Sequence, residues 1–485
     1  MLDMNRIASL PANKARPITF AHKVLMPALF VVTGILYAVL MIADMLPVWS
    51  LAALAGVWVL YTSLNGRLSP ATPLDMPILA MLILLGLSWF VSIDRNLSIS
   101  KIEGLLLGIS LYYFLTNYLW RTRQLRLVIP ALVVLSIGVS ALGLVGADWD
   151  FAQATVFSPI YARLPHLISA VPRSTFNGIN VNTVGGALGF FIPLLFSLLW
   201  DQGAFNRTFI SSKQKLKTSI YKLSLVFAFC FCGALLVLTQ SRGAMLGSAC
   251  GMLAVAIWKN RRFLWILPIL LAAFLLFFFF VAHGNLSSLV TNLDSNEYST
   301  LPGRLEAWRN TIYLIQDFPI SGTGIGTYSK LFNEVYTFIP FSLQGAGSAH
   351  AHNSYLAVAT DLGLPGLLLY MSLFSSAAGM TIKLVRTSRS ITRALVIGLA
   401  CGLLSHMVFG LTDAYLLGTK LGGIMWIFFG VIAAVYAHQK RFSSHARGLP
   451  VDTAASQVRR GTRVWQVLGG LGLWLLFSAA AVAVV

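Results

Sequence analysis

The sequence predicts an all-α polytopic membrane protein. Its composition, the spacing of its apolar runs and the placement of its basic residues each support that fold class. Of its 485 residues 57% are hydrophobic and 11% are charged, and the mean hydropathy is +0.77. A soluble domain carries about a quarter charged residues and just under half apolar ones. A water-soluble core cannot hide this much apolar surface, which excludes a soluble enzyme.

The apolar runs have the length and spacing of membrane helices, since roughly 20 apolar residues cross the hydrocarbon core. Twelve spans are predicted near residues 24–44, 48–63, 75–93, 102–120, 127–147, 180–200, 223–239, 243–258, 263–282, 353–380, 394–415 and 421–437, and residues 464–485 form a candidate thirteenth. Before the first run stand Arg6, Lys14 and Arg16, and no small-residue cleavage site follows a short apolar core. We therefore expect the first span to be a retained signal anchor.

The net charge of +19 reports membrane topology rather than a nucleic-acid surface. With the N-terminus in the cytoplasm, only nine of the 35 lysines and arginines fall on the outer side, in agreement with the positive-inside rule. These nine are Arg95, Lys101, Arg163, Arg173, Arg242, Arg304, Arg309, Lys330 and Lys420. We expect a multi-pass protein in contact with membrane lipids and no nucleic-acid partner.

The spans divide the chain into five segments. Residues 1–282 hold about nine spans, 283–352 form a large outer loop, 353–437 hold spans ten to twelve, 438–463 form a basic cytoplasmic linker, and 464–485 hold the candidate last span. All four cysteines lie within spans, which excludes a disulfide framework or a cysteine zinc site in the outer loops.

The large outer loop is predicted to contain a helix that lies near the membrane surface. From Gly303 to Gln316 the apolar residues Leu305, Trp308, Ile312 and Ile315 recur at helical spacing, directly after Pro302. Arg304 shares a side of this helix with Trp308, while Arg309 points elsewhere. The guanidinium of Arg304 either forms a solvated cation–π pair or holds a phosphate group, for which its forked donors are suited.

Two further places carry candidate functional residues. Arg242 lies at a tight outer hairpin between two spans, against the positive-inside rule, and is either functional or a snorkelling structural arginine. His350 and His352 lie where the large loop re-enters the membrane. Histidine can accept a proton at neutral pH, so either is a candidate base. A metal site or a structural role at the start of the span remains the alternative.

Two short motifs receive no functional role. Asp148 and Asp150 form an Asp-x-Asp pair of the kind that binds a divalent cation in many glycosyltransferases, but so short a pattern often occurs by chance. The glycine run Gly322–Gly326 follows no strand of a βαβ unit, so a flexible turn is a better interpretation than a phosphate loop.

The motifs together resemble the O-antigen ligase and polymerase superfamily. The resemblance rests on Arg304, Trp308, Phe318-Pro319-Ile320, Gly322-Thr323-Gly324-Ile325-Gly326, His352-Asn353-Ser354-Tyr355-Leu356, Asp361-Leu362-Gly363-Leu364-Pro365-Gly366, Thr239-Gln240-Ser241-Arg242-Gly243 and Phe176–Asn182. It covers roughly residues 170–380. Val181 stands where the family often has proline.

The resemblance implies a membrane-embedded glycosyltransferase of the GT-C type in the bacterial inner membrane, with its active site facing the periplasm. The donor would be a polysaccharide on undecaprenyl diphosphate, and the acceptor the outer sugar of lipid A-core. His352 would be the base, with His350 as the reserve candidate, and Arg242 and Arg304 would stabilise the diphosphate, so that neither a metal nor another cofactor is expected. Candidate substrate-binding residues are Arg163, Arg173, Trp308, Arg309, Asn353 and Tyr355.

Other activities remain open. An O-antigen polymerase and a protein O-oligosaccharyltransferase share these motifs, although a single dominant outer loop favours the ligase. A lipid or oligosaccharide transporter is the competing class. Glu103, Asp361, His406 and Asp413 are the few ionisable groups within the spans, near span ends or on helix surfaces. A proton-coupled transporter is expected to place more of them near mid-membrane.

Overall fold

Long apolar helices make up most of the described part of the chain. The structure is a computed structural model that describes residues 24–42, 46, 48–122, 125–147, 149, 158–161, 163, 179–201, 215–270, 272, 276, 301–336, 351–388, 390–414 and 417–446. The described helices are α3 (Met26–Ile42), α4 (Val48–Asn65), α5 (Asp75–Val91), α6 (Arg95–Thr122), α7 (Leu125–Gly146), α8 (Ser158–Tyr161), α10 (Val181–Trp200), α12 (Lys215–Leu238), α13 (Arg242–Lys259), η3 (Arg261–Trp265), α16 (Leu301–Asp317), α17 (Tyr328–Glu334), α18 (Ser354–Thr387), α19 (Ser390–Phe409), η4 (Lys420–Gly422) and α20 (Gly423–Ala446). Among these residues the only extended pairing is one isolated bridge between Ala147 and Ile179.

The helices agree with an all-helical membrane protein. Six of those described, α6, α7, α10, α12, α18 and α19, are long and apolar enough to cross a membrane. Eleven of the thirteen predicted spans coincide with a described helix. The span predicted at 263–282 is described only in part, and residues 464–485 lie outside the described residues.

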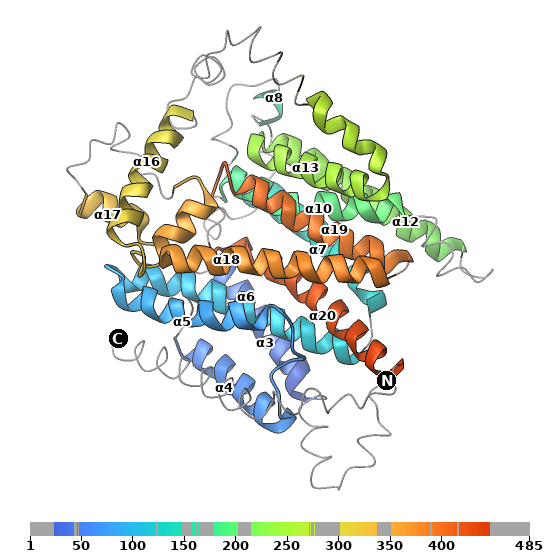
Figure 1. Ribbon diagram of the computed structural model, residues 1–485, viewed down its shortest axis with the longest axis horizontal. Helices are drawn as coiled ribbons and strands as arrows, with labels where there is room; N and C mark the ends of the chain where they lie inside the picture. The colour runs from blue at the N-terminus through green and yellow to red at the C-terminus, as the bar shows by residue number, and fades with distance from the viewer. Residues whose placement is uncertain are drawn as a thin grey trace.

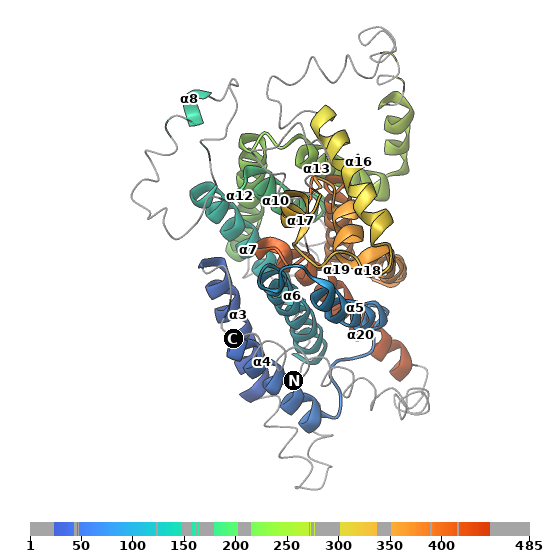
Figure 2. The same cartoon turned by 90° about the vertical axis from the view of Figure 1, so that its left-hand side faces the viewer.

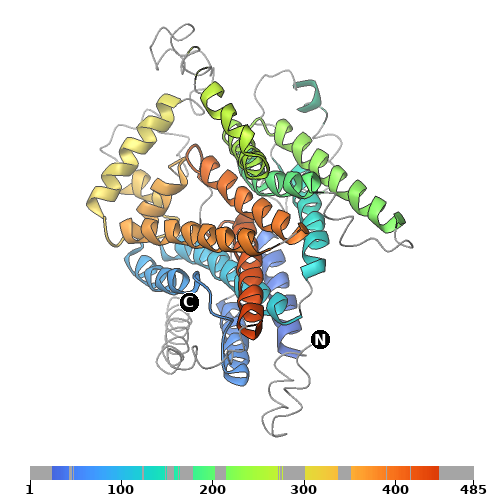
Figure 3. The same cartoon turned by 45° about the vertical axis from the view of Figure 1, so that its right-hand side comes forward.

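The long helices form a bundle that carries α16 and α17 at one end. Figure 1 shows these two helices at the left-hand end of the bundle, and Figure 2 turns that end toward the viewer. In both Figure 1 and Figure 3, α16 runs steeply across the direction of α18. Because α18 is a candidate span, α16 runs across the end of the bundle rather than along it.

Glycines let α10, α13 and α19 approach closely. Those at the contacts are Gly185, Gly186 and Gly189 in α10, Gly243, Gly247 and Gly251 in α13, and Gly398 and Gly402 in α19. A Cβ atom at Gly251 would lie 2.8 Å from the carbonyl oxygen of Cys401. Small residues allow such close backbone contact between membrane helices, and here they fix the relative position of three helices whose ends form the candidate site.

Replacing Gly247 with leucine should destabilise the protein. A Cβ atom there would clash with the backbone oxygen of Ser405, and overpacking of this kind costs about 1–3 kcal/mol. The midpoint of thermal aggregation in detergent, followed by size-exclusion chromatography, should fall. Gly379→Leu is the matched control, because a Cβ at Gly379 would meet no atom of another described element within 4 Å. Equal losses in the two variants would show that the α13–α19 contact is not the cause.

The glycine run is a turn that anchors α16 and α17 to the bundle. Gly322, Gly324 and Gly326 have φ angles of 66°, 100° and 79°, which side chains rarely adopt. The amide of Thr323 donates to the carbonyl oxygen of Thr360 at 2.8 Å. The turn packs beside a break in α18 at Gly363, where φ is 72°. The predicted turn is therefore present, and backbone hydrogen bonds hold it in place.

An ion pair also attaches α17 to the turn between α5 and α6. Lys330 Nζ lies 2.7 Å from Asp94 Oδ2. The hydrogen bond from Lys330 lowers the pKa of Asp94, and the same bond raises the pKa of Lys330. The pair is therefore complete between the ordinary pKa values of 3.8 and 10.5. It is lost as the pH falls through the lowered pKa of Asp94 or rises through the raised pKa of Lys330.

We expect the attachment of α17 to be insensitive to pH between about 5 and 9 and to weaken in stronger acid. At neutral pH, Asp94→Asn should speed hydrogen exchange of the α17 amides. Exchange in the wild type at low pH, once corrected for the slower intrinsic exchange in acid, should show the same loss of protection. Glu334→Gln serves as the control, because Glu334 lies 3.9 Å from Lys330 and is exposed, and it should change little. Unchanged exchange in Asp94→Asn would mean that the turn alone attaches α17.

Candidate functional site

The ends of four helices meet at one end of the bundle. A Cβ atom at Gly243, the second residue of α13, would clash with Thr412, which follows α19. At Gly185, near the start of α10, it would lie 2.9 Å from Cβ of Ser241. The amide of Ser354, the first residue of α18, donates to the carbonyl oxygen of Gly410 at 2.8 Å. The N-termini of α10, α13 and α18 thus lie around the C-terminal end of α19.

His352 and Asp413 form a hydrogen-bonded pair at this meeting point. His352 Nδ1 lies 3.3 Å from Asp413 Oδ1. The side chain of His352 is 28% exposed and that of Asp413 only 9%. A carboxylate beside Nδ1 favours the tautomer with its proton on Nδ1, which leaves Nε2 as a proton acceptor. The pair has the geometry of a base whose ring is oriented by an acid.

The backbone around His352 is held by the residues that follow it. Asn353 caps α18, because its side-chain oxygen accepts from the amides of Tyr355 and Leu356. Its Nδ2 atom donates to the carbonyl oxygen of Leu411 at 3.2 Å. His352 itself has a φ of 46°, in the left-handed region that few non-glycine residues adopt. Capping by Asn353 therefore fixes the start of α18 beside the turn that carries Asp413.

Arg242 begins α13 next to the same turn. The chain reverses between α12 and α13 at Gln240, whose φ is 51°, and Ser241 is buried while Arg242 is exposed. Gly243 packs against Thr412, so the residue next to Arg242 contacts the turn that carries Asp413. The N-terminus of a helix carries partial positive charge. Three such termini and a guanidinium make this end of the bundle favourable for an anion.

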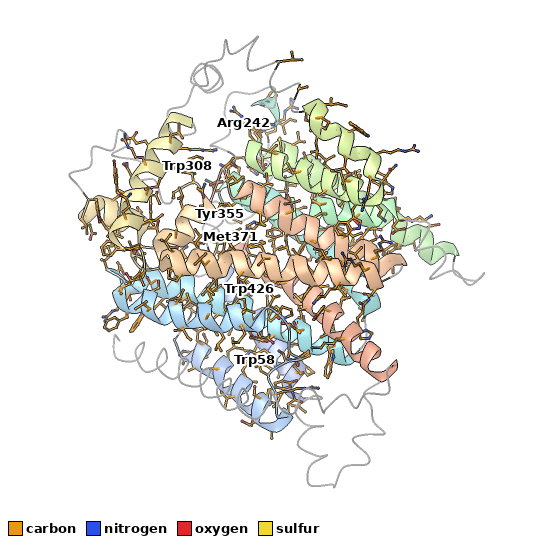
Figure 4. The ribbon with its side chains drawn as sticks, in the orientation of Figure 1. Trp58, Arg242, Trp308, Tyr355, Met371 and Trp426 are labelled. Atoms are coloured by element: carbon orange, nitrogen blue, oxygen red, sulfur yellow. The ribbon has the colours of Figure 1, made fainter. Side chains whose placement is uncertain are left out.

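Arg304 and Trp308 lie on a half-buried side of α16. Among the described residues, Arg304 Nε and Trp308 Nε1 are buried without a hydrogen-bond partner, whereas Arg309 is exposed. In α16, Leu314 packs in a small cluster with Tyr328 and with Ala351, the residue before His352. In the view of Figure 4, Trp308 and Tyr355 lie below and to the left of Arg242, in the upper half of the molecule. The structure thus brings α16 to the site, although no contact between Arg304 and His352 or Arg242 is described.

The other predicted site residues lie away from the His352–Asp413 pair or outside the described residues. The hydroxyl of Tyr355 donates to the carbonyl oxygen of Met407 at 2.7 Å, which directs it into the contact between α18 and α19. Arg163 is exposed in a turn after α8, and Tyr161 of that helix donates to the carbonyl oxygen of Leu238 at the end of α12. His350 and Arg173 lie outside the described residues.

Asp413 is a candidate site residue that the sequence does not reveal. In the sequence it stands out only as one of the few ionisable groups within the spans. Its carboxylate is now found against His352, 61 positions earlier in the chain. The signal that could have identified Asp413 is its acidic side chain near an outer helix end, where most of the candidate site residues are arginine or histidine.

These features define a helical membrane protein with a histidine–aspartate pair and an arginine where several helix ends meet. Residues 225–371, just under a third of the chain, match the family model described as O-antigen ligase. This part of the chain is therefore similar to the O-antigen ligase family, which confirms the predicted resemblance. The matched segment contains Arg242, Arg304 and His352, and Asp413 lies beyond it. No curated protein matches the chain.

Proposed function

We propose that this protein is an O-antigen ligase. It transfers a polysaccharide from undecaprenyl diphosphate to the outer sugar of lipid A-core, at the periplasmic face of the bacterial inner membrane. The observation that carries the proposal is the meeting of the His352–Asp413 pair with Arg242 and three helix N-termini at one end of the bundle. A proton acceptor and an anion-binding region are the two requirements for glycosyl transfer from a diphosphate.

The base in this mechanism is His352. Its Nε2 atom takes the proton of the acceptor hydroxyl as the hydroxyl oxygen attacks the anomeric carbon of the donor. The imidazolium that forms is stabilised by the carboxylate of Asp413, which lies at Nδ1. His350, close to His352 in the chain, is the reserve candidate for the base.

The leaving group is the lipid diphosphate. The bond between the anomeric carbon and the diphosphate oxygen breaks as the new glycosidic bond forms, so one displacement inverts the anomeric configuration. Negative charge grows on the diphosphate, and Arg242 and Arg304 are proposed to stabilise it. Arg163, Arg173, Trp308 and Asn353 are proposed to bind donor or acceptor, and Arg309, on the exposed side of α16, to contact lipid phosphates. Tyr355 is proposed to position the start of α18 through the bond from its hydroxyl to Met407.

The proposed topology follows from the distribution of charge. The chain would cross the inner membrane twelve or thirteen times as a GT-C type fold, with its N-terminus in the cytoplasm. The helix ends that form the candidate site are the ones that the positive-inside rule assigns to the outer side. We also propose that transfer needs no metal, because the arginines supply the positive charge.

The test uses purified protein, lipid-linked glycan and rough lipopolysaccharide, with a chelator and with neither nucleotide sugar nor ATP. The proposal expects glycan to appear on the lipopolysaccharide. Transfer that requires an added divalent cation would contradict only the metal-independent mechanism.

Other outcomes identify the alternatives. Lengthening of the lipid-linked donor without transfer to lipopolysaccharide would identify a polymerase. Transfer to a protein hydroxyl would identify an O-oligosaccharyltransferase. Movement of donor across the bilayer of a proteoliposome, without transfer to any acceptor, would identify a transporter and overturn the proposal.

A further inference from the structure

One side of α16 is apolar and yet exposed. Leu305, Ile312 and Tyr313 are 51%, 45% and 46% exposed. With the exposed Arg309 they have the spacing i, i+4, i+7 and i+8, which places all four on one side of the helix. A different set forms the buried side of α16: Ala307, Asn310, Thr311 and Leu314. The exposed residues are therefore not part of the contact between α16 and the bundle.

This apolar side continues into surface that faces lipid. After α16, Phe318 and Ile320 are 38% and 70% exposed. The amide of Leu364 in α18 donates to the carbonyl oxygen of Pro319 at 2.8 Å, so this segment abuts a candidate span. Leu364 and Leu368 of that span are themselves 46% and 71% exposed. An exposed apolar face on a membrane-spanning helix is covered by acyl chains.

A second set of exposed apolar residues lies at the same end of the bundle. Phe90, Ile93 and Leu97, around the turn between α5 and α6, are 70%, 44% and 45% exposed. Gly324 packs against Ser92 in that turn. Aromatic and apolar residues at the ends of spans are typical of the boundary between acyl chains and headgroups. The segment after α16 thus lies at the depth of this boundary.

We infer that the side of α16 formed by Leu305, Arg309, Ile312 and Tyr313 rests in the headgroup layer of the bilayer at this end of the bundle. An amphipathic helix that crosses the direction of the spans and carries a cation among apolar residues is suited to an interface of phospholipids. The nearest acidic residues of α16, Glu306 and Asp317, lie at the edge of this side and not between the four. Arg309 places its guanidinium among lipid phosphates, while the three apolar side chains enter the upper acyl region.

The position of α16 in the headgroup layer also sets the depth of Arg304 and Trp308. Arg304 and Trp308 lie on the neighbouring side of the same helix. A helix held at the headgroup layer keeps Arg304 at the depth of lipid phosphates, which is also the depth of the diphosphate of a lipid-linked donor. This consequence rests on the proposed function, whereas the contact of α16 with lipid does not.

The experiment measures whether the exposed side of α16 lies in lipid or in water. Neither donor nor acceptor is present. Full-length protein with its four cysteines replaced is spin-labelled at Ile312→Cys and reconstituted in nanodiscs with an anionic phospholipid. The collision rates of the label with oxygen, which concentrates in lipid, and with a water-soluble nickel complex are compared. Leu368→Cys is the lipid-facing control, and Glu334→Cys, on an exposed position of α17, is the aqueous control.

The label at Ile312 should show an oxygen-to-nickel ratio several-fold above that at Glu334 and close to that at Leu368. A ratio equal to that at Glu334 would overturn the inference, because the helix would then lie in water. Low rates with both reagents would also overturn it, since protein would then cover this side of α16.

A second measurement needs no substitution. Wild-type protein is irradiated in bilayers that contain a phospholipid with a photoreactive group near its headgroup, and the cross-linked peptides are identified by mass spectrometry. Cross-links on residues 305–316 are expected alongside those on residues 364–371. Cross-links on residues 364–371 alone would contradict the contact of α16 with lipid, whatever the outcome of the transfer assay.

Discussion

Replacing His352 with alanine should lower the rate of glycan transfer by about 10²- to 10⁴-fold, the usual contribution of a positioned general base. The donor should still bind, because the arginines and the helix N-termini remain. The rate is measured with purified variant, lipid-linked glycan and rough lipopolysaccharide, and donor binding is measured separately. His438→Ala is the control, since this histidine lies on α20, near its C-terminal end.

Asp413→Asn tests the same base through its partner. The asparagine keeps the shape of the side chain but removes the charge that would stabilise an imidazolium. The transfer rate should therefore fall, by less than in His352→Ala, and the double variant should resemble His352→Ala. Full activity in His352→Ala would remove His352 as the base and make His350 the next candidate. Losses that multiply in the double variant would mean that the two residues act independently.

Replacing Arg242 with alanine should lower the transfer rate by about 10²- to 10³-fold, the usual loss when one stabilising donor is removed from a site of developing charge. Most of the loss should appear in kcat, because the negative charge on the diphosphate grows as the glycosyl bond breaks. Arg242→Lys should recover part of the rate. Lysine keeps the charge but not the forked pair of donors.

The control for Arg242 is Arg262→Ala, which removes the same charge in η3, just beyond the other end of α13. It should leave the rate unchanged. A similar loss in both variants would point to a general effect of charge on membrane insertion. If Arg242→Ala raised KM and left kcat unchanged, Arg242 would contribute to substrate binding alone.

Helix positions were predictable because they depend on local composition. The predicted helix at Gly303–Gln316 lies within α16, and the predicted span at 180–200 coincides with α10. Burial was less predictable. The apolar residues Leu305 and Ile312, which indicated the helix, are exposed, while Asn310 and Thr311 are buried. Periodicity reveals a helix, but it cannot distinguish a side that contacts protein from one that contacts lipid.

The sequence by itself determined that the chain is a helical membrane protein and pointed to Arg242, Arg304 and His352. Hydrophobic length, charge asymmetry and side-chain chemistry are properties of short segments, so they can be read without a fold. Only the tertiary structure decided that Asp413 meets His352 and that α10, α13, α18 and α19 bring their ends together. These contacts join residues far apart in the chain. They depend on which helices approach closely. Gly243 allows close approach to Thr412, and Gly185 allows close approach to Ser241.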